Sequence, residues 1–412
     1  MYTFSIDLFS FLVRIAAFLG HVKAKRLCEG QKQVWTQLQT RLQPDERRIW
    51  IHCASVGEFE QGRPLMEDIR AKFPQFKILV TFFSSSGYEL RKDYAGADYV
   101  FYLPFDTRRN ARRFFELVHP EKIYFIKYEF WRNYMKIAKR RNIPLYLVSA
   151  IFRPGQVFFK WYGGWYRKLL TEVTHFFVQN EQSKELLAGI GLTHATVTGD
   201  TRFDRVCRIF DQAKQIPDVE RFVDGQICMV AGSTWPPDEK ILTRYINTEN
   251  RNIKWIIVPH ELHDHQIDRL IASVKTKAVR YSQLSATNPA DYSVLIIDNM
   301  GMLSSLYRYG AVAYIGGGFG KWIHNTLEAA VYGIPVFFGP AYKKFQEAVD
   351  LAALGGAIPI RNDDEFFVQL NHLLDHPDKL KKLGEIAGAF VASGRGATEK
   401  VLQETFMDFE KQ

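Results

Sequence analysis

Hydrophobic and polar positions alternate in a regular way along most of this chain. From about Arg47 onward, short apolar runs are separated by segments whose apolar residues recur at helical spacing. Short buried runs between amphipathic helices are typical of crossover units, in which helices cover both faces of a parallel sheet. The pattern therefore predicts strands at RIWIHCAS, KILVTFFS, DYVFYLPF, KIYFIKYEF, PLYLVSAIF, HFFVQN, QICMVAGST, KWIIVPHE, SVLIIDN, AVAYIGGGF and PVFFGP.

The alternation is interrupted once, near the middle of the chain. Residues 201–225 are polar and contain no strand-like run, so we interpret 206–225 as an interdomain linker. The fold class predicted is α/β, with two Rossmann-like doubly wound domains over 21–205 and 226–412, the latter ending in helices. Ligands of such sheets bind outside the carboxyl ends of the strands, which places the expected site in a cleft where the domains face each other. This layout is typical of GT-B glycosyltransferases, of some epimerases and, more loosely, of two-domain dehydrogenases.

The first twenty residues form a separate apolar segment. Residues 2–19 are mostly apolar but contain Asp7 and Arg14, and a basic stretch follows them. A secretory signal has its positive charge before the apolar part and ends in small residues, which is not the order here. We expect residues 1–20 to form a membrane-associating helix, either spanning the bilayer or lying in its interface. The alternative is an amphipathic helix packed on the first domain.

Composition narrows the class of protein. The chain has 412 residues, 47% of them hydrophobic and 24% charged, which indicates two or three packed domains and excludes a disordered protein. Four cysteines without a CxxC pair exclude a disulfide scaffold, argue against structural zinc and favour a reducing compartment. The net charge of +9 favours an anionic partner: nucleic acid, an anionic membrane surface or a phosphorylated substrate.

Polar clusters follow the predicted strands directly, where a doubly wound sheet binds its ligands. In the first half they are ASVGE (54–58), FFSSSG (82–87), KYEFWRN (127–133) and GDTRFD (199–204). In the second half they are AGSTWPPDE (231–239), PHE (259–261), DNMG (298–301) and GGGFGKWIHNTLEAA (316–330).

Three charged residues of the first half are candidates for chemistry. Glu58 follows a small-residue turn, where a carboxylate either caps a helix or serves as a general base. Glu129 lies among aromatic residues and is either a paired structural carboxylate or part of the site. Arg202 is a natural clamp for a carboxylate or phosphate, with an ordinary surface arginine as the alternative.

The second half contains a candidate phosphate site. Ser233 and Thr234 come before a predicted helix, where hydroxyls and backbone N–H groups attract an anion. Asn325 and Glu328 share one helix face, and the glutamate is placed to accept hydrogen bonds from a ribose. The glycines at 316–320 form neither GxGxxG with a matching acidic residue nor a Walker loop, and HELHDH is not HExxH. We therefore expect no dinucleotide and no metal.

Taken in order, these motifs resemble those of the 3-deoxy-D-manno-octulosonic acid (Kdo) transferases of lipopolysaccharide synthesis. The resemblance rests on ASVGE, YEFWRN, GDTRFD, AGST, PHE, DNMG and HNTLEA and covers nearly the whole chain. It implies a GT-B enzyme at the cytoplasmic face of the inner membrane that transfers Kdo from CMP-Kdo to the lipid A precursor (lipid IVA). It also implies an inverting reaction with no metal, no cofactor and no nucleic acid.

The resemblance also implies residue roles. The catalytic base matches Glu58, and the two residues that stabilise the transition state match Glu129 and Arg202. The contacts to CMP match Pro259, His260, Met300, Gly301, Met302, Asn325, Thr326, Leu327 and Glu328.

The chain departs from the family pattern at four positions. Arg202 replaces a lysine that is common there, His260 an arginine, and Met302 and Lys127 acidic residues. A histidine at 260 is expected to hold a phosphate less firmly than arginine and in a pH-dependent way. Two other functions remain open: a transferase or epimerase that uses a UDP-sugar, and a non-catalytic basic protein that binds membranes or nucleic acid.

Overall fold

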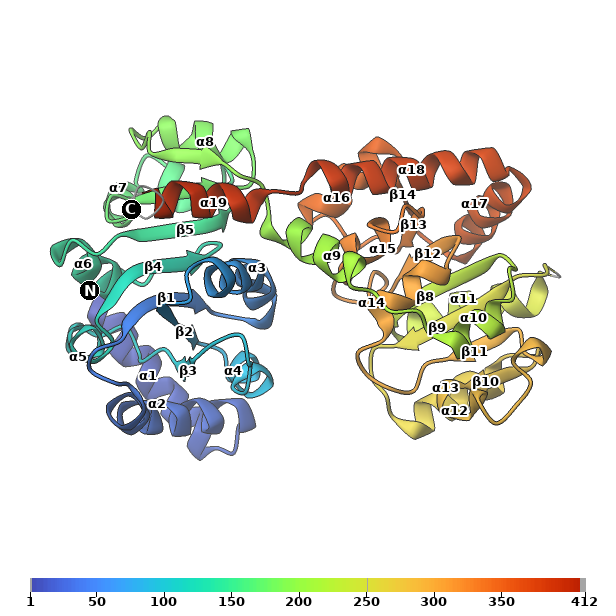
Figure 1. Ribbon diagram of the computed structural model, residues 1–412, viewed down its shortest axis with the longest axis horizontal. Helices are drawn as coiled ribbons and strands as arrows, with labels where there is room; N and C mark the ends of the chain where they lie inside the picture. Colours follow the sequence, from blue (N-terminus) through green and yellow to red (C-terminus); the bar gives the residue numbers. More distant parts are fainter. Residues whose placement is uncertain (1, 250, 408–412) are drawn as a thin grey trace. The chain divides into compact units, whose positions relative to one another are not determined.

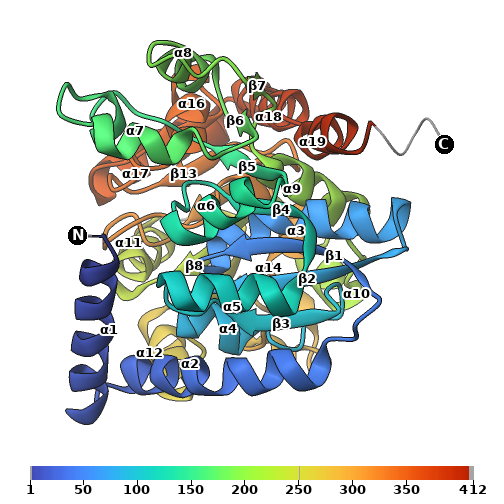
Figure 2. The same cartoon turned by 90° about the vertical axis from the view of Figure 1, so that its left-hand side faces the viewer.

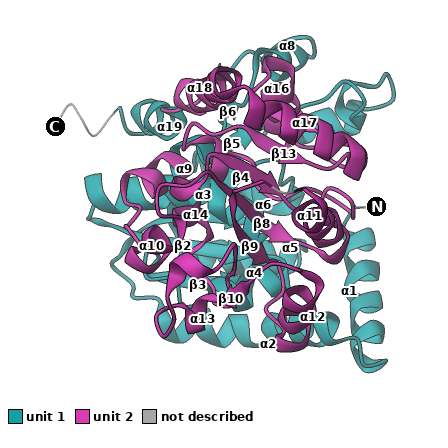
Figure 3. Ribbon diagram, turned by 90° about the vertical axis from the view of Figure 1, so that its right-hand side faces the viewer, with its two compact units in different colours: residues 1–205, 396–412 teal, residues 206–395 magenta. Residues whose placement is uncertain are grey.

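The computed structural model describes residues 2–249 and 251–407, and the chain divides into two compact units (Figures 1 and 3). Unit 1 comprises Met1–Arg205 and Gly396–Gln412, and unit 2 comprises Val206–Arg395. Each unit is built around its own seven-stranded parallel sheet, as the alternation of apolar runs predicts. The expected placement of the domains around a cleft stays a prediction.

The sheet of unit 1 has the strand order β3-β2-β1-β4-β5-β6-β7, with every neighbouring pair parallel. The strand order reverses at β1, which lies between β2 and β4. Such a switch point is where doubly wound sheets bind ligands. The strands are β1 Arg47–Cys53, β2 Phe76–Phe82, β3 Tyr99–Tyr102, β4 Pro120–Ile126, β5 Leu145–Ala150, β6 His175–Val178 and β7 Ala195–Val197.

Helices cover both faces of this sheet, because its central strands are apolar on both sides. Ile49, Trp50 and Ile51 are successive residues of β1 and all three are fully buried. The helices are α1 Tyr2–Phe18, α2 Val22–Arg41, α3 Val56–Lys72, α4 Ser85–Arg91, α5 Arg108–Val118, α6 Arg132–Arg140, α7 Gly164–Leu170, α8 Glu181–Ala188, α9 Thr201–Asp211 and α19 Ala397–Phe406, with a short 3₁₀ turn, η1 Val157–Phe159.

The C-terminal helix α19 belongs to unit 1, which differs from the expected second domain of residues 226–412. The ring of Phe406 stacks on Phe73 with centroids 4.0 Å apart, and Tyr124 Oη donates to Thr405 Oγ1 at 2.8 Å. Asp204 accepts from the backbone N–H groups of Gly396 and Thr398 at 2.6 and 2.7 Å, so it caps the start of α19. The helix returns because unit 1 has an apolar face that α19 covers.

The apolar N-terminal segment forms α1, which packs on unit 1 through part of its surface (Figure 2). Tyr2 Oη donates to Asp106 at 2.6 Å, and the ring of Phe9 contacts Phe83 and Phe105. Among the helices of residues 2–249 and 251–407, none has both the length and the apolar character needed to cross a membrane.

The sheet of unit 2 has the order β10-β11-β9-β8-β12-β13-β14 and is also parallel throughout. Strand order changes direction at β8, which lies between β9 and β12. The strands are β8 Cys228–Thr234, β9 Lys254–Pro259, β10 Ala278–Arg280, β11 Val294–Ile296, β12 Val312–Ile315, β13 Val336–Phe338 and β14 Ala357–Pro359.

Most of the segment expected as a linker folds as part of unit 2. α9 runs on to Asp211, and α10 (Pro217–Val223) buries Val219, Phe222 and Val223, so residues 206–225 are not an open connection. The remaining helices are α11 Pro236–Thr248, α12 Asp264–Ser273, α13 Tyr281–Leu284, α14 Leu303–Leu306, α15 Leu327–Ala330, α16 Gln346–Leu354, α17 Asp363–Asp375 and α18 Pro377–Ser393, with 3₁₀ turns η2 Pro289–Asp291 and η3 Tyr307–Tyr309.

Candidate active site

The two carboxylates predicted for chemistry lie at the switch point of unit 1. Glu58 is in the first turn of α3, directly after β1, and Glu129 follows β4, the neighbouring strand. The two carboxylates interact electrostatically, because the charge of Glu129 raises the pKa of Glu58. The structure therefore brings together two of the three candidate catalytic residues.

Glu58 has features of both a helix-capping carboxylate and a general base. Ser55 caps α3 by accepting the backbone N–H of Glu58 at 3.4 Å, and Glu58 Oε2 accepts the N–H of Ala54 at 2.5 Å. The side chain is 8% exposed. Burial and, next, the charge of Glu129 raise the pKa of Glu58 to about 7, against the opposing effects of the Ala54 bond and of Lys127. A carboxyl that titrates near neutral pH suits a general base.

Glu129 is held by aromatic and imidazole groups. Trp131 Nε1 donates to Glu129 Oε2 at 2.7 Å, and His52 Nε2 lies 3.6 Å from the same oxygen. His52 is fully buried on β1, and its other ring nitrogen, Nδ1, lies 2.8 Å from Thr81 Oγ1. Sequence reasoning missed His52 and Thr81. The signal was their place inside two neighbouring apolar strands, where a polar side chain needs a partner.

Arg202 is engaged inside unit 1 and does not stand free as a clamp. Its guanidinium donates to Asp200 Oδ2 from Nε at 3.0 Å and from Nη2 at 2.7 Å. Gln61 of α3 donates to both oxygens of the same carboxylate, at 3.0 and 3.1 Å. Burial opposes ionisation of Asp200, but the charge and hydrogen bonds of Arg202 lower its pKa. In this structure, Arg202 neutralises the buried Asp200, which also accepts from Gln61, a residue one turn along α3 from Glu58.

Two residues at strand ends near these side chains have left-handed backbones. Lys127, after β4, has φ +71°, and Ser149, in β5, has φ +53°. Such conformations cost free energy for residues other than glycine and are concentrated at functional sites. Ser149 is held by its hydroxyl, which lies 2.9 Å from Thr201 Oγ1 and accepts the N–H of Thr201 at 3.1 Å.

The four polar clusters of unit 2 follow β11, β9, β8 and β12, which are consecutive in the sheet. Pro259 ends β9, and the N–H of His260 donates to the carbonyl of Thr234 at 2.9 Å. The sheet thus brings together the sequence-predicted residues Thr234, Pro259 and His260 at one carboxyl edge. Met300, Gly301 and Met302 follow β11 one strand farther out, and the Met300 side chain is 85% exposed.

An aromatic stack that the sequence did not reveal lies at this edge. The ring of His260 stacks against both Trp235 and His324, with centroids 4.6 and 4.5 Å away. Trp235 Nε1 donates to His324 Nε2 at 3.2 Å. Burial and then the neighbouring His260 lower the pKa of His324 to about 4, so its ring is neutral at pH 7 and accepts this bond. Flat rings of this kind suit a nucleobase or a sugar face.

The start of α11 differs from the anion site that Ser233 and Thr234 predict. Pro236 and Pro237 open the helix, so two backbone donors are lost. The carboxylate of Asp238 already accepts the N–H groups of Trp235 and Gly317, at 2.9 and 2.8 Å. The glycine run also packs on its own chain: a Cβ at Gly316 would lie 2.2 Å from the carbonyl oxygen of Ser233. The glycine at 316 therefore allows this loop to lie against the backbone of Ser233.

Of the predicted pair, Asn325 precedes α15 and Glu328 lies in its first turn, and the two side chains meet. Asn325 Nδ2 donates to Glu328 Oε1 at 3.0 Å, and Asn325 Oδ1 accepts the N–H of Leu327 at 3.1 Å. Between them in sequence, the buried hydroxyl of Thr326 has no hydrogen-bond partner among the residues that the structure describes. Residues 2–249 and 251–407 contain no group of three or more His, Cys, Asp or Glu placed to hold a metal ion.

Comparison with known proteins identifies the family. Residues 21–205 match the family described as 3-Deoxy-D-manno-octulosonic-acid transferase (kdotransferase). The 3-deoxy-D-manno-octulosonic acid transferase of Aquifex aeolicus is 26% identical over 354 residues, which are 83% of this chain and 91% of that protein. The enzyme of the same name from Rickettsia felis is 25% identical over 368 residues, which are 86% of this chain and 78% of that protein.

A solved structure supports the fold. UDP-GlcNAc 2-epimerase from Neisseria meningitidis, bound to UDP-GlcNAc, has a TM-score of 0.61 at 15% identity and covers 88% of this chain and 100% of its own. At this identity, the likeness concerns the two parallel-sheet α/β units alone. The sequence comparisons go beyond the fold: residues 21–205 match the 3-deoxy-D-manno-octulosonic acid transferase family, a family of glycosyltransferases, and relatives of that name are similar to this chain over 83% and 86% of its length.

Proposed function

We propose that this protein is an inverting transferase that moves Kdo from CMP-Kdo to a lipid A precursor at a membrane surface. The observation that carries the proposal is Glu58. Burial and the charge of Glu129 raise its pKa to about 7, and it lies at the switch point of unit 1, directly after β1. A proton acceptor of that kind is what an acceptor hydroxyl needs.

In the proposed reaction, the hydroxyl oxygen of the acceptor attacks the anomeric carbon of Kdo as its proton passes to Glu58. The bond from that carbon to the phosphate oxygen breaks, and CMP leaves with the electron pair. Glu129 would stabilise the positive charge that develops on the sugar, held in place by Trp131. Arg202 is held by Asp200, and its positive charge would favour the leaving phosphate.

Unit 2 is proposed to hold CMP. The cluster of Trp235, His260 and His324 offers aromatic surface for stacking, and Asn325 with Glu328 offers hydrogen bonds to a ribose. Thr234, Pro259 and Met300–Met302 border the same edge of the sheet. Stacking is the stronger contribution here, because the amino end of α11 is already occupied by Asp238.

Membrane association is proposed from the surface of unit 1. Along α1, Phe4 and Phe18 are 71% and 90% exposed, and beyond η1 Trp161 is 91% exposed. Exposed aromatic and apolar side chains beside basic residues are typical of a helix lying in a membrane interface. The proposed location is the cytoplasmic face of the inner membrane. There CMP-Kdo is available and cysteines are kept reduced.

The test is a transfer assay with product analysis. The protein is incubated with CMP-Kdo and a tetra-acylated lipid A precursor, and the lipid is examined by mass spectrometry. We expect the lipid to gain one or more Kdo residues, and Glu58→Gln to fold normally but yield none. An unmodified lipid with intact donor would overturn the proposal, as would thermal stabilisation by UDP and not by CMP.

A further inference from the structure

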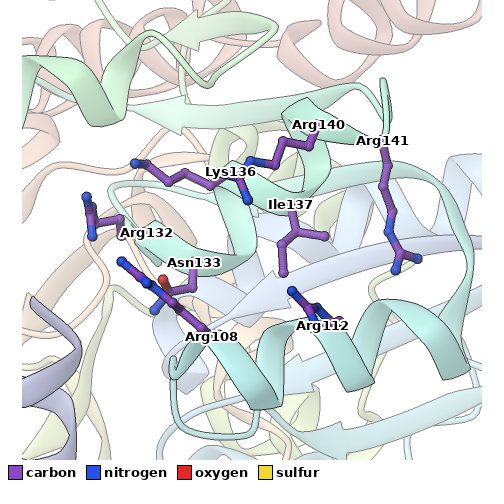
Figure 4. Close-up of a pocket in the computed structure, with 8 residues that line it drawn as sticks. All are labelled: Arg108, Arg112, Arg132, Asn133, Lys136, Ile137, Arg140 and Arg141. Atoms are coloured by element: carbon purple, nitrogen blue, oxygen red, sulfur yellow. The ribbon is translucent and has the colours of Figure 1, made fainter.

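A strongly basic pocket lies between α5 and α6 of unit 1 and belongs to no site described so far (Figure 4). Its volume is about 410 Å³. Six cationic side chains and two uncharged ones line it: Arg108, Arg112, Arg132, Asn133, Lys136, Ile137, Arg140 and Arg141. No carboxylate is among them, so the pocket concentrates positive charge.

Most of these cations lack a counter-ion within the protein. Arg108, Arg112, Lys136 and Arg140 form no ion pair with any residue in the described part of the chain. Arg141 donates to the carbonyl of Phe115 at 3.1 Å and comes only within 4.0 Å of a carboxylate. Like charges gathered in this way repel each other, and a bound anion removes that repulsion.

The pocket is built on a fixed base. Its uncharged member Asn133 is 4% exposed, and its backbone N–H donates to both oxygens of Asp106 at 3.1 Å. Asn133 Nδ2 also donates to the carbonyl of Asp106, at 2.5 Å. Asp106 lies just before α5, so these bonds tie the start of α6 to the start of α5 and set the spacing of the cationic side chains.

One residue of the pocket, Arg132, connects it with Glu129 and with the exposed aromatic side chains. Arg132 follows Trp131, whose indole holds Glu129, and its guanidinium lies over the rings of Tyr2 and Trp165 at 5.8 and 5.2 Å. Tyr2 belongs to α1 and Trp165 to α7, the elements with exposed aromatic side chains. A lipid-borne group lying on those aromatics and reaching toward Glu129 would pass Arg132.

We propose that this pocket binds a phosphoryl group of the lipid acceptor. Arginine guanidinium groups match phosphate oxygens in pairs, and a dianion is the charge that a cluster without carboxylates favours. This inference rests on the proposed function, which supplies the identity of the acceptor. What it adds is the place in unit 1 where the phosphate of that acceptor binds. The contact positions the acceptor hydroxyl near Glu58, so removal of pocket charges acts mainly on acceptor KM.

The experiment compares two double variants of the full-length protein. Arg112→Gln with Lys136→Gln removes two pocket charges. Arg109→Gln with Lys139→Gln removes the same two residue types from the same two helices, outside the pocket. For each, KM and kcat are measured with the phosphorylated acceptor and with the same lipid after phosphatase treatment. Binding of the lipid in neutral detergent and of phosphatidylglycerol vesicles is measured without donor.

We expect the pocket variant to raise KM for the phosphorylated acceptor at least tenfold, with little change in kcat or in donor KM, and the control variant to match wild type. With the dephosphorylated lipid, both variants should behave alike. Equal KM values in pocket and control variants would overturn the proposal while leaving transferase activity intact. Loss of vesicle binding in the pocket variant alone would assign the pocket to membrane phospholipid and also overturn it. If wild type lacks transfer, pocket-dependent binding of the phosphorylated lipid still supports the pocket, and its absence rejects it.

Discussion

His52 Nε2 lies 3.6 Å from Glu129 Oε2, and hydrogen bonding on the far side of the ring decides how the two groups meet. Trp50 Nε1 can only donate, so Thr81 Oγ1 accepts from it at 2.8 Å. The single hydroxyl proton of Thr81 is then available to His52 Nδ1, also at 2.8 Å. In the tautomer in which Thr81 donates to Nδ1, His52 carries its proton on Nε2, facing Glu129, and acts as a positioning residue for that carboxylate.

The first prediction concerns Thr81. Thr81→Val keeps the shape of the side chain but leaves Trp50 Nε1 and His52 Nδ1 without their partner in the interior. We expect the free energy of unfolding to fall by about 2 kcal/mol or more, because unsatisfied buried groups cost about 1–3 kcal/mol each. Urea denaturation measures it, with Thr40→Val on the exposed surface of α2 as the control. Equal effects in the two variants would contradict the proposed chain of hydrogen bonds.

The second prediction concerns pH and Glu58. Its pKa is raised to about 7 by burial and by Glu129, so between pH 4.5 and 7 the folded protein binds more protons than the unfolded chain. Stability contributed by this group falls as pH rises through that window. Glu58→Gln should therefore be more stable than wild type at pH 8, by at most about 3 kcal/mol, while transfer is lost. Parallel stability curves from pH 4.5 to 8 would show that Glu58 is not perturbed.

The third prediction concerns His324, whose contribution to stability changes with pH in the direction opposite to that of Glu58. The pKa of His324 is lowered to about 4 by burial and by His260, so between pH 4 and 6.5 the unfolded chain binds the extra proton. This contribution to stability is complete above pH 6.5 and is lost as pH falls toward 4. A histidine NMR titration should place the His324 midpoint near pH 4, with His324→Gln identifying the resonance. A midpoint close to 6.5 would contradict the buried stack of Trp235, His260 and His324.

The fourth prediction tests the membrane surface. Phe4→Ser with Phe18→Ser should weaken binding to anionic vesicles at least tenfold, since each buried aromatic side chain contributes about 1.5–3 kcal/mol. Transfer to acceptor in detergent micelles should persist. Leu354→Ser with Val368→Ser removes two exposed apolar side chains from unit 2 and serves as the control. Vesicle sedimentation measures both, and an equal loss of binding would remove α1 from the membrane contact.

The fifth prediction concerns α19. Phe406 is 1% exposed and stacks on Phe73, so Phe406→Ala should cost about 3–5 kcal/mol of stability. The adjacent Met407 is 56% exposed, and Met407→Ala should change stability by less than about 0.5 kcal/mol. Thermal unfolding of the two variants, followed side by side, tests whether the C-terminal helix is part of unit 1.

Sequence periodicity predicted the central sheet strands and missed three. β7, β10 and β14 have three residues each, and each ends its sheet. An edge strand is paired on one side and needs only a short apolar segment, so its pattern is weak. The return of α19 was missed for a related reason: amphipathic spacing marks a helix but does not say which apolar face it covers.

The candidate site was predicted in part because strand ends are readable from sequence. Glu58 and Glu129 were found, and the parallel sheet places them on neighbouring strands. Their partners His52 and Thr81 lie within apolar strands and carry no motif. The pairing of Arg202 with Asp200 was also not readable, since sequence shows that an arginine is near a site but not which carboxylate it contacts. GDTRFD likewise includes Asp204, whose observed contacts are to α19.

Because α19 covers an apolar face of unit 1 and follows unit 2 in the chain, unit 1 is completed only after unit 2 has been synthesised. During synthesis, unit 2 can assemble while Phe73 and Phe76 are not yet covered by Phe406. A nascent chain halted after residue 395 would expose that surface to chaperones and proteases. Translation therefore has to pass through the whole of unit 2 before the apolar face of unit 1 is covered.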